Sequence, residues 1–134
     1  VVLAGLKSPT GGSAKVLSLS RTKKIDGLIS EIVLNEVVRN AHKIGFEEEQ
    51  TKLWLKSIFD HIHQAPKIET VKKYEKVVID AGDAHVLASC HEVKANFLVT
   101  LDKKHLLILQ KKIMGVQMRQ TPCQAFLQFP ASLE

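Results

Sequence analysis

The chain has 134 residues, of which 45% are hydrophobic and 25% charged, the balance of one soluble globular domain. No apolar run approaches the roughly 20 residues of a membrane-spanning helix, so no such helix is expected. The net charge of +5 is compatible with a polyanionic partner, but the lysines are scattered, so charge alone favours nucleic acid only weakly. The two cysteines, Cys90 and Cys123, have no disulfide-framework spacing and are expected to be buried, reduced side chains.

Apolar runs of strand length alternate along the chain with segments of helical periodicity. In chain order, the predicted elements are a strand at residues 1–6, a helix at 14–21, a strand at 25–29, helices at 31–43 and 47–63, a strand at 74–79, a helix at 84–94, a strand at 97–101, a short helix at 103–109, a strand at 116–118 and a helix at 121–128. Ser30 suits the N-cap of the helix that follows it. The first strand has no preceding Met, so we expect further sequence upstream of it.

This alternation predicts the α/β class, in the form of a three-layer α/β/α sandwich with a mainly parallel central sheet. The apolar run at 97–101 is continuous, as expected when both faces of a parallel strand are covered. No internal repeat, low-complexity tract or linker interrupts the pattern, so residues 1–134 are expected to form a single domain.

Acidic residues fall where open parallel sheets place their ligand sites, at the carboxyl ends of strands. Asp102 directly follows the strand at 97–101, and Asp80 and Asp83 follow the segment at 74–79. Glu36 lies at the margin of the apolar stripe of its helix. Carboxylate oxygens are the ligands that Mg²⁺ and Mn²⁺ prefer, and paired ions of this kind support phosphodiester hydrolysis. The combination of these four residues therefore favours a divalent metal site.

Each acid also has a simpler interpretation. Asp80, Asp83 and Asp102 all precede predicted helices, where Asp is a favourable cap and suits the helix dipole. Glu36 alone can be a solvated flank residue, and Glu31 lies as near the opposite border of the same stripe. Periodicity does not choose between the two glutamates.

At these residues the sequence resembles the PIN-domain family, in particular its bacterial toxin-like branch. The segment 80–88 is similar to that family's Asp-x-x-Asp entry into a helix, and 98–106 to the strand-to-helix turn that carries the last acidic ligand. Three further stretches are similar but less specific: 1–6 with the loop after it, 30–37, and the Pro-containing segment 121–127. The likeness spans nearly the whole chain in the family's order.

The resemblance implies a cytoplasmic endoribonuclease that uses Mg²⁺ or Mn²⁺. Its metal ligands would be Glu36, Asp83 and Asp102, with Asp80 in support, and the family pattern selects Glu36 rather than Glu31. The basic residues expected to hold the RNA backbone are Lys7, Lys103 and Lys104. The toxin-like branch further implies an antitoxin protein as partner and a homodimer.

One feature of the family pattern is missing from the chain. The family's first-strand Asp would lie just upstream of Val1. The alternative function is therefore a catalytically impaired PIN-like module that binds RNA or protein. A phosphate-binding doubly wound domain is disfavoured, because Gly11-Gly12-Ser13 lacks the length and the lysine of a phosphate loop.

The histidines invite two further interpretations. His61 and His63, two residues apart on a predicted helix, would point to different sides, which disfavours a zinc site. His85 and His105 follow Asp83 and Asp102 closely. They are expected to be surface or partly buried imidazoles, with contact to a phosphate as the alternative.

Overall fold

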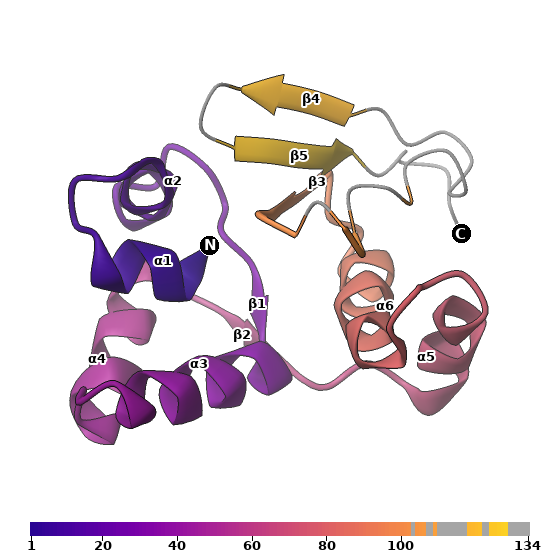
Figure 1. The fold of residues 1–134 in the computed structure, drawn as a ribbon, viewed down its shortest axis with the longest axis horizontal. Helices are drawn as coiled ribbons and strands as arrows, with labels where there is room; N and C mark the ends of the chain where they lie inside the picture. Colours follow the sequence, from indigo (N-terminus) through magenta and orange to yellow (C-terminus); the bar gives the residue numbers. More distant parts are fainter. Residues whose placement is uncertain (103, 107–108, 110–117, 122–123, 129–134) are drawn as a thin grey trace. The chain divides into compact units, whose positions relative to one another are not determined.

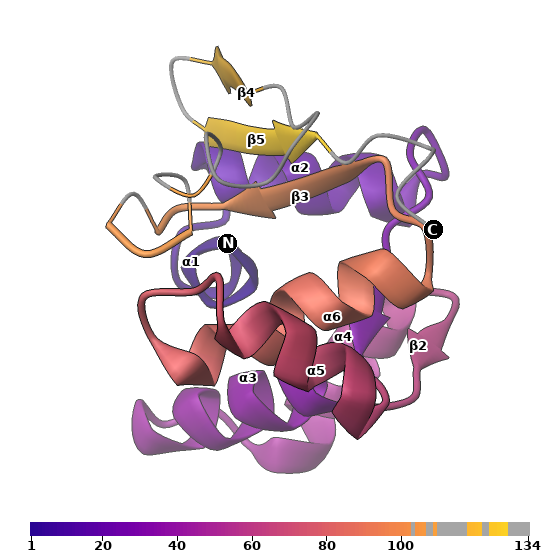
Figure 2. The same cartoon turned by 90° about the vertical axis from the view of Figure 1, so that its right-hand side faces the viewer.

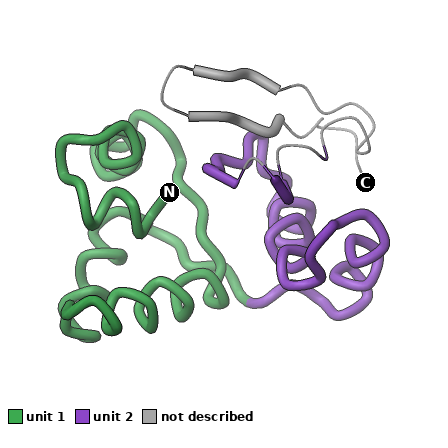
Figure 3. The backbone as a smooth tube through the Cα atoms, in the orientation of Figure 1, with its two compact units in different colours: residues 1–64 green, residues 65–134 purple. Residues whose placement is uncertain are grey.

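The computed structural model describes residues 1–102, 104–106, 109, 118–121 and 124–128 (Figure 1, Figure 2). The chain divides into two compact units, residues 1–64 and residues 65–134, and each is described here by itself (Figure 3). That residues 1–134 form a single domain stays a prediction. Among the described residues, no helix has both the length and the apolar character needed to cross a membrane.

The first unit packs four helices around a hydrophobic core and contains a short parallel pair of strands. Its elements are α1 (Val2–Lys7), α2 (Gly12–Arg21), β1 (Ile29–Ser30), α3 (Glu31–Lys43), α4 (Glu48–Ile58) and β2 (Ile62–His63). Helix α3 has the predicted bounds, and the Ser30 hydroxyl accepts the backbone N–H of Val33 at 3.2 Å, so the predicted N-cap is confirmed. Its buried stripe contributes Leu34, Val37 and Val38 to the core.

Residues 1–6 were predicted to be a strand, and this prediction is wrong, because Val2–Lys7 form helix α1. A helix satisfies its own backbone groups, and none of the described strands pairs with this segment. Val2 and Leu3 pack against the core of the unit. Gly5 permits α1 to approach α2 closely, since a Cβ atom at this position would lie 2.5 Å from Cδ1 of Leu17.

The predicted helix at 47–63 is too long, because α4 ends at Ile58. Phe59 has extended backbone angles (φ −113°, ψ 115°) and its ring is buried in the core. The hydroxyl of Ser20 donates a hydrogen bond to the Ile58 carbonyl at 2.8 Å. The chain then forms β2, which pairs in parallel with β1 through Ile29↔Ile62 and Ser30↔His63. Of the strand predicted at 25–29, only Ile29 belongs to β1.

The second unit contains α5 (Ile68–Glu75), the 3₁₀ helix η1 (Ala81–Asp83), α6 (Ala84–Glu92), β3 (Phe97–Thr100), β4 (Met118–Thr121) and β5 (Gln124–Gln128). Helices α5 and α6 lie side by side in both views (Figure 1, Figure 2). Oε1 of Glu92, the last residue of α6, accepts the Lys67 N–H and the Thr70 hydroxyl, each at 2.9 Å. Glu92 thereby attaches the start of α5 to the end of α6.

The strand predicted at 74–79 is wrong, because α5 runs through Glu75 and a turn follows it. The Tyr74 hydroxyl lies 2.9 Å from Nδ1 of His91, and the two rings pack edge to face. Val77 and Val78 pack with Tyr74 against a buried cluster formed by Leu87 of α6, Leu106 and Leu109. The valines of this segment therefore serve a helix-to-helix contact, which alternation in the sequence does not distinguish from a strand.

The terminal helix predicted at 121–128 is wrong, because Met118–Thr121 and Gln124–Gln128 are strands. β5 pairs antiparallel with β3, from Phe97↔Gln128 to Thr100↔Ala125, and also with β4. Only residues 122–123 separate β4 from β5, and strands joined by so short a connection can pair only in the antiparallel sense.

The α/β class is confirmed, and β1 and β2 form a short parallel pair, although the residues of β2 were predicted to be helical. The three-stranded sheet, in the order β3-β5-β4, is antiparallel. Helix 84–94 and strand 97–101 are confirmed within two residues of their predicted ends. Residues 104–106 form a turn where a short helix was predicted, and Met118, the end of the strand predicted at 116–118, begins β4. Cys123, residues 116–117 and much of 103–109 lie outside the described residues.

The core of the first unit can be tested with two leucines of α4. Leu55 is fully buried and Leu53 is 67% exposed. Leu55→Ala is expected to lower the free energy of unfolding by about 2–5 kcal/mol, because it leaves a cavity, whereas Leu53→Ala should change it by less than about 0.5 kcal/mol. Chemical denaturation of both variants measures the difference. Equal effects at the two positions would contradict the packing of α4.

Candidate metal centre

Asp80 is the N-cap of η1. Its Oδ1 atom accepts the backbone N–H of Gly82 at 2.9 Å, and the side chain is otherwise exposed. The interpretation of Asp80 as a helix cap is therefore correct for one of its oxygens. Within the described part of the chain, no such hydrogen bond is made by its second oxygen, which can serve as a ligand.

Asp83 ends η1 and directly precedes α6, but its side chain makes no capping hydrogen bond. Its Oδ2 atom is buried and has no hydrogen-bond partner among the residues that the structure describes. Burial, followed by the negative charges of Asp102 and Asp80, raises the pKa of Asp83 above its ordinary value, and His105 and His85 partly offset the rise. Helix capping thus does not explain Asp83. Its carboxylate is held where a nearby cation would stabilise it.

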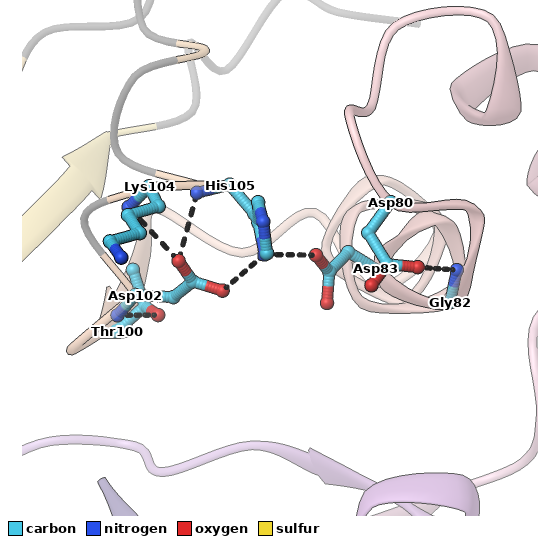
Figure 4. Close-up of polar contacts among 7 residues, drawn as sticks. All are labelled: Asp80, Gly82, Asp83, Thr100, Asp102, Lys104 and His105. Atoms are coloured by element: carbon cyan, nitrogen blue, oxygen red, sulfur yellow. Dashed lines mark hydrogen bonds and ion pairs between the residues drawn. The ribbon is translucent and has the colours of Figure 1, made fainter.

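Asp102 directly follows β3 and organises the turn after it. Its Oδ1 atom accepts the backbone N–H groups of Lys104 at 3.1 Å and His105 at 2.8 Å. The backbone N–H of Asp102 donates to the hydroxyl of Thr100 at 3.1 Å, and Thr100 is buried. These bonds fix the orientation of the carboxylate with one oxygen committed to the turn. The other oxygen, Oδ2, points toward His105 (Figure 4).

His105 lies between the two carboxylates. Its Nδ1 atom is 3.4 Å from Oδ2 of Asp102 and 3.9 Å from Oδ2 of Asp83 (Figure 4). The imidazole is 42% exposed, so solvent reaches the site from this side. Sequence reasoning had given His105 no definite role, although its spacing of three residues from Asp102 places it in the same turn.

Together these residues form a group that can hold a metal ion. Ligand atoms of Asp80, Asp83 and His105 all lie within 4.8 Å of one another, and Asp102 contacts His105 from the other side. Carboxylate oxygens are ligands that Mg²⁺ and Mn²⁺ accept, and an imidazole nitrogen is a ligand that first-row transition-metal ions accept. The buried, unbonded oxygen of Asp83 is the observation that fits such an ion best, because it leaves a negative charge uncompensated.

Glu36 belongs to α3 in the first unit, and the other three predicted ligands belong to the second. Glu36 is half-buried and Glu31 is exposed, so burial favours the glutamate that the family pattern selects. That Glu36 meets Asp83 and Asp102 stays a prediction. Of the predicted RNA contacts, Lys7 and Lys104 are exposed, and Lys103 lies outside the described residues.

His61 and His63 are not on a helix, because β2 begins at Ile62, so the geometric argument used against a shared zinc ion at these two residues does not apply. Within the described part of the chain, however, the group of ligating side chains that can hold an ion is Asp80, Asp83 and His105, which contains neither of them. Cys90 carries a free thiol, and burial raises its pKa to about 12, which makes it unreactive near neutral pH.

The family model of the PIN domain matches residues 1–104, which include Glu36, Asp80, Asp83 and Asp102. The chain therefore belongs to the PIN-domain family, and the predicted resemblance is confirmed at this level. PIN domains are generally nucleases and usually bind divalent metal ions. No curated protein and no solved structure matches the chain.

The raised pKa of Asp83 gives a prediction for the stability of the metal-free protein. Asp83→Asn is expected to raise the free energy of unfolding by about 1 kcal/mol near pH 7, because it removes a desolvated charge that two carboxylates repel. The folded-state pKa of Asp83 is raised above 3.8, so the wild type loses stability as pH rises through that pKa. The advantage of the variant should therefore disappear below pH 3.8.

Denaturation in a chelating buffer at both pH values measures this effect. Glu75→Gln, at an exposed residue of α5, is the matched control and should change little. A gain of equal size at both pH values would show that the charge of Asp83 is not its cause.

Proposed function

We propose that this chain is a metal-dependent endoribonuclease of the PIN type, with Mg²⁺ or Mn²⁺ as its ion. The observation that carries the proposal is the buried, unbonded carboxylate oxygen of Asp83 beside Asp102 in a chain whose family consists generally of nucleases. Such an arrangement is costly for a protein without a cation and useful for one that binds it.

The residues that would hold the ion are Asp83, Asp102 and Glu36, with Asp80 in support. When bound, a divalent ion lowers the pKa of water and stabilises the leaving oxygen of a phosphodiester. The protein supplies the orientation. Oδ1 of Asp102 accepts two backbone N–H groups, and the backbone N–H of Asp102 donates to the Thr100 hydroxyl. These bonds orient the carboxylate and leave its Oδ2 atom available. Asp83 is held by its place at the end of η1, directly before the first turn of α6.

RNA is the proposed substrate, and lysines would hold its phosphate backbone through charge. Lys104 is exposed and lies in the turn that Asp102 caps, two residues from the proposed ligand. Lys7 and Lys103 complete the proposed set. The formal net charge of +5 supports attraction to a polyanion without specifying its sequence.

The resemblance to the toxin-like branch supports a further proposal on the biological role and the partners of the chain. In that view the chain is the toxin of a toxin–antitoxin pair, acts in the cytoplasm, forms a homodimer and is inhibited by a cognate antitoxin protein. These four statements rest on the resemblance of the sequence segments alone.

An RNA-cleavage assay tests the proposal. The full chain is incubated with structured and single-stranded RNA in the presence of Mn²⁺ or Mg²⁺. Asp102→Asn is expected to lower the cleavage rate by about 100-fold or more, because it removes a charged ligand, whereas Glu75→Gln should cut at the wild-type rate. Equal cleavage by wild type and Asp102→Asn would end the nuclease proposal.

The same assay distinguishes the alternative, a catalytically impaired PIN-like module. A chain that binds RNA and cuts none with either ion fits that alternative. Sequencing upstream of the Val1 codon then decides its origin, because an in-frame Asp a few residues earlier would supply the first acid of the family pattern.

The contribution of Lys104 is measured by RNA binding in the Asp102→Asn background, which prevents cleavage. Lys104→Ala is expected to weaken binding several-fold on every RNA sequence. It should also lower the slope of log affinity against log salt by about 0.7, the value for one phosphate contact on a single strand. Lys72→Ala, at an exposed position of α5, is the control. An unchanged slope for Lys104→Ala would exclude a phosphate contact there.

A further inference from the structure

His105 has a position that the four acids of the family pattern do not explain. It is not one of those acids, and its imidazole lies between Asp83 and Asp102 (Figure 4). The distances from Nδ1 to the two carboxylate oxygens, 3.9 Å and 3.4 Å, are longer than those of charge-assisted hydrogen bonds. Nδ1 is thus near both carboxylates without a short bond to either.

The backbone of His105 is fixed independently of its side chain. Its N–H donates to Oδ1 of Asp102 at 2.8 Å, so the residue is tied to the turn that Asp102 organises. The imidazole itself is 42% exposed and is not buried in a core. Its ring can therefore adjust by a rotation about its side-chain bonds while the carboxylates stay in place. This combination of a fixed backbone and a free donor atom suits a metal ligand.

A space for one ion is already outlined by these atoms. Ligand atoms of Asp80, Asp83 and His105 lie within 4.8 Å of one another, the scale on which donors surround a common cation. Oδ2 of Asp83 is buried and unbonded, and it is the carboxylate oxygen that faces Nδ1 of His105. The nitrogen and the orphaned oxygen thus converge from two different elements, the turn after β3 and the start of α6.

We propose that His105 is a nitrogen ligand of the metal that this site takes, and that it makes the site prefer a first-row transition-metal ion such as Mn²⁺, Co²⁺ or Ni²⁺ over Mg²⁺. This inference rests on the proposed function, since it concerns the same site. Mg²⁺ selects oxygen ligands and retains its waters, whereas an imidazole nitrogen adds affinity for transition metals in the order Mn²⁺, Co²⁺, Ni²⁺. A site made of carboxylates alone would discriminate among these ions less steeply.

The matched variant is His105→Gln, which replaces the nitrogen donor by an amide oxygen and leaves the backbone bond to Asp102 intact. Isothermal titration of the full chain with each ion is expected to show a loss of about 10-fold or more in Ni²⁺ and Co²⁺ affinity, a smaller loss for Mn²⁺, and little change for Mg²⁺. His61→Gln, at an exposed histidine of the first unit, should bind all four ions as the wild type does. Equal losses for Mg²⁺ and Ni²⁺ would overturn the assignment of a nitrogen ligand.

Pulsed electron paramagnetic resonance of the Mn²⁺-loaded chain gives a second readout that a structural role for His105 would not affect. A coordinated imidazole produces a coupling to ¹⁴N, which is expected in the wild type and in His61→Gln and absent from His105→Gln. A wild type that binds Mn²⁺ without this coupling, or a His105→Gln variant that retains it, overturns the inference.

These outcomes separate the inference from the proposed function. A chain that shows the ¹⁴N coupling and cuts no RNA refutes the nuclease and keeps the ligand. A chain that cuts RNA with Mn²⁺ and shows no coupling refutes the ligand and keeps the nuclease.

Discussion

The site depends on the Asp83 carboxylate, whose negative charge the described residues leave without a hydrogen-bonded partner at Oδ2. Oδ2 of Asp83 is buried and unbonded, and Asp102 and Asp80 add negative charge beside it, which together raise the pKa of the carboxyl group. In a protein interior such a group costs free energy unless a hydrogen bond or a cation offsets it. His105 supplies a donor that is near but not bonded. The arrangement is therefore one that a divalent ion completes.

The three aspartates of this arrangement have different hydrogen-bonding roles. Asp80 and Asp102 each use one oxygen to cap local backbone, and their other oxygens stay available. Asp83 makes no such bond, although it occupies the position where a helix cap is expected. The buried Leu87 packs α6 into the hydrophobic cluster of the second unit. The Thr100 hydroxyl accepts the backbone N–H of Asp102 and so fixes the turn after β3. Local capping thus orients the ligands, and packing determines where they meet.

Membership of the PIN-domain family connects this geometry with nucleases, because the matched segment, residues 1–104, contains Glu36, Asp80, Asp83 and Asp102. Glu36 lies on the half-buried margin of α3, in a unit whose core is built from the stripe of the same helix. The nuclease proposal needs this glutamate to act with the acids of the second unit. The proposed nitrogen ligand, His105, lies in the turn after β3 beside the carboxylate of Asp102.

The sequence by itself determined the features that local interactions control. Helix α3 and its Ser30 cap, helices α2 and α6, strand β3 and the candidate acids were all readable, because capping and helical periodicity act within a few residues. Tertiary structure decided the rest. Residues 1–6 became a helix packed on Leu17, residues 74–79 a helix end against Leu87, and residues 124–128 a strand against β3. In each case a short apolar run fits either a helix or a strand, and only its distant packing partner selects one. His105 is near Asp102 because the two residues are three positions apart in the sequence. Asp83 is distant from both in the sequence, so only the tertiary structure brings it close to His105.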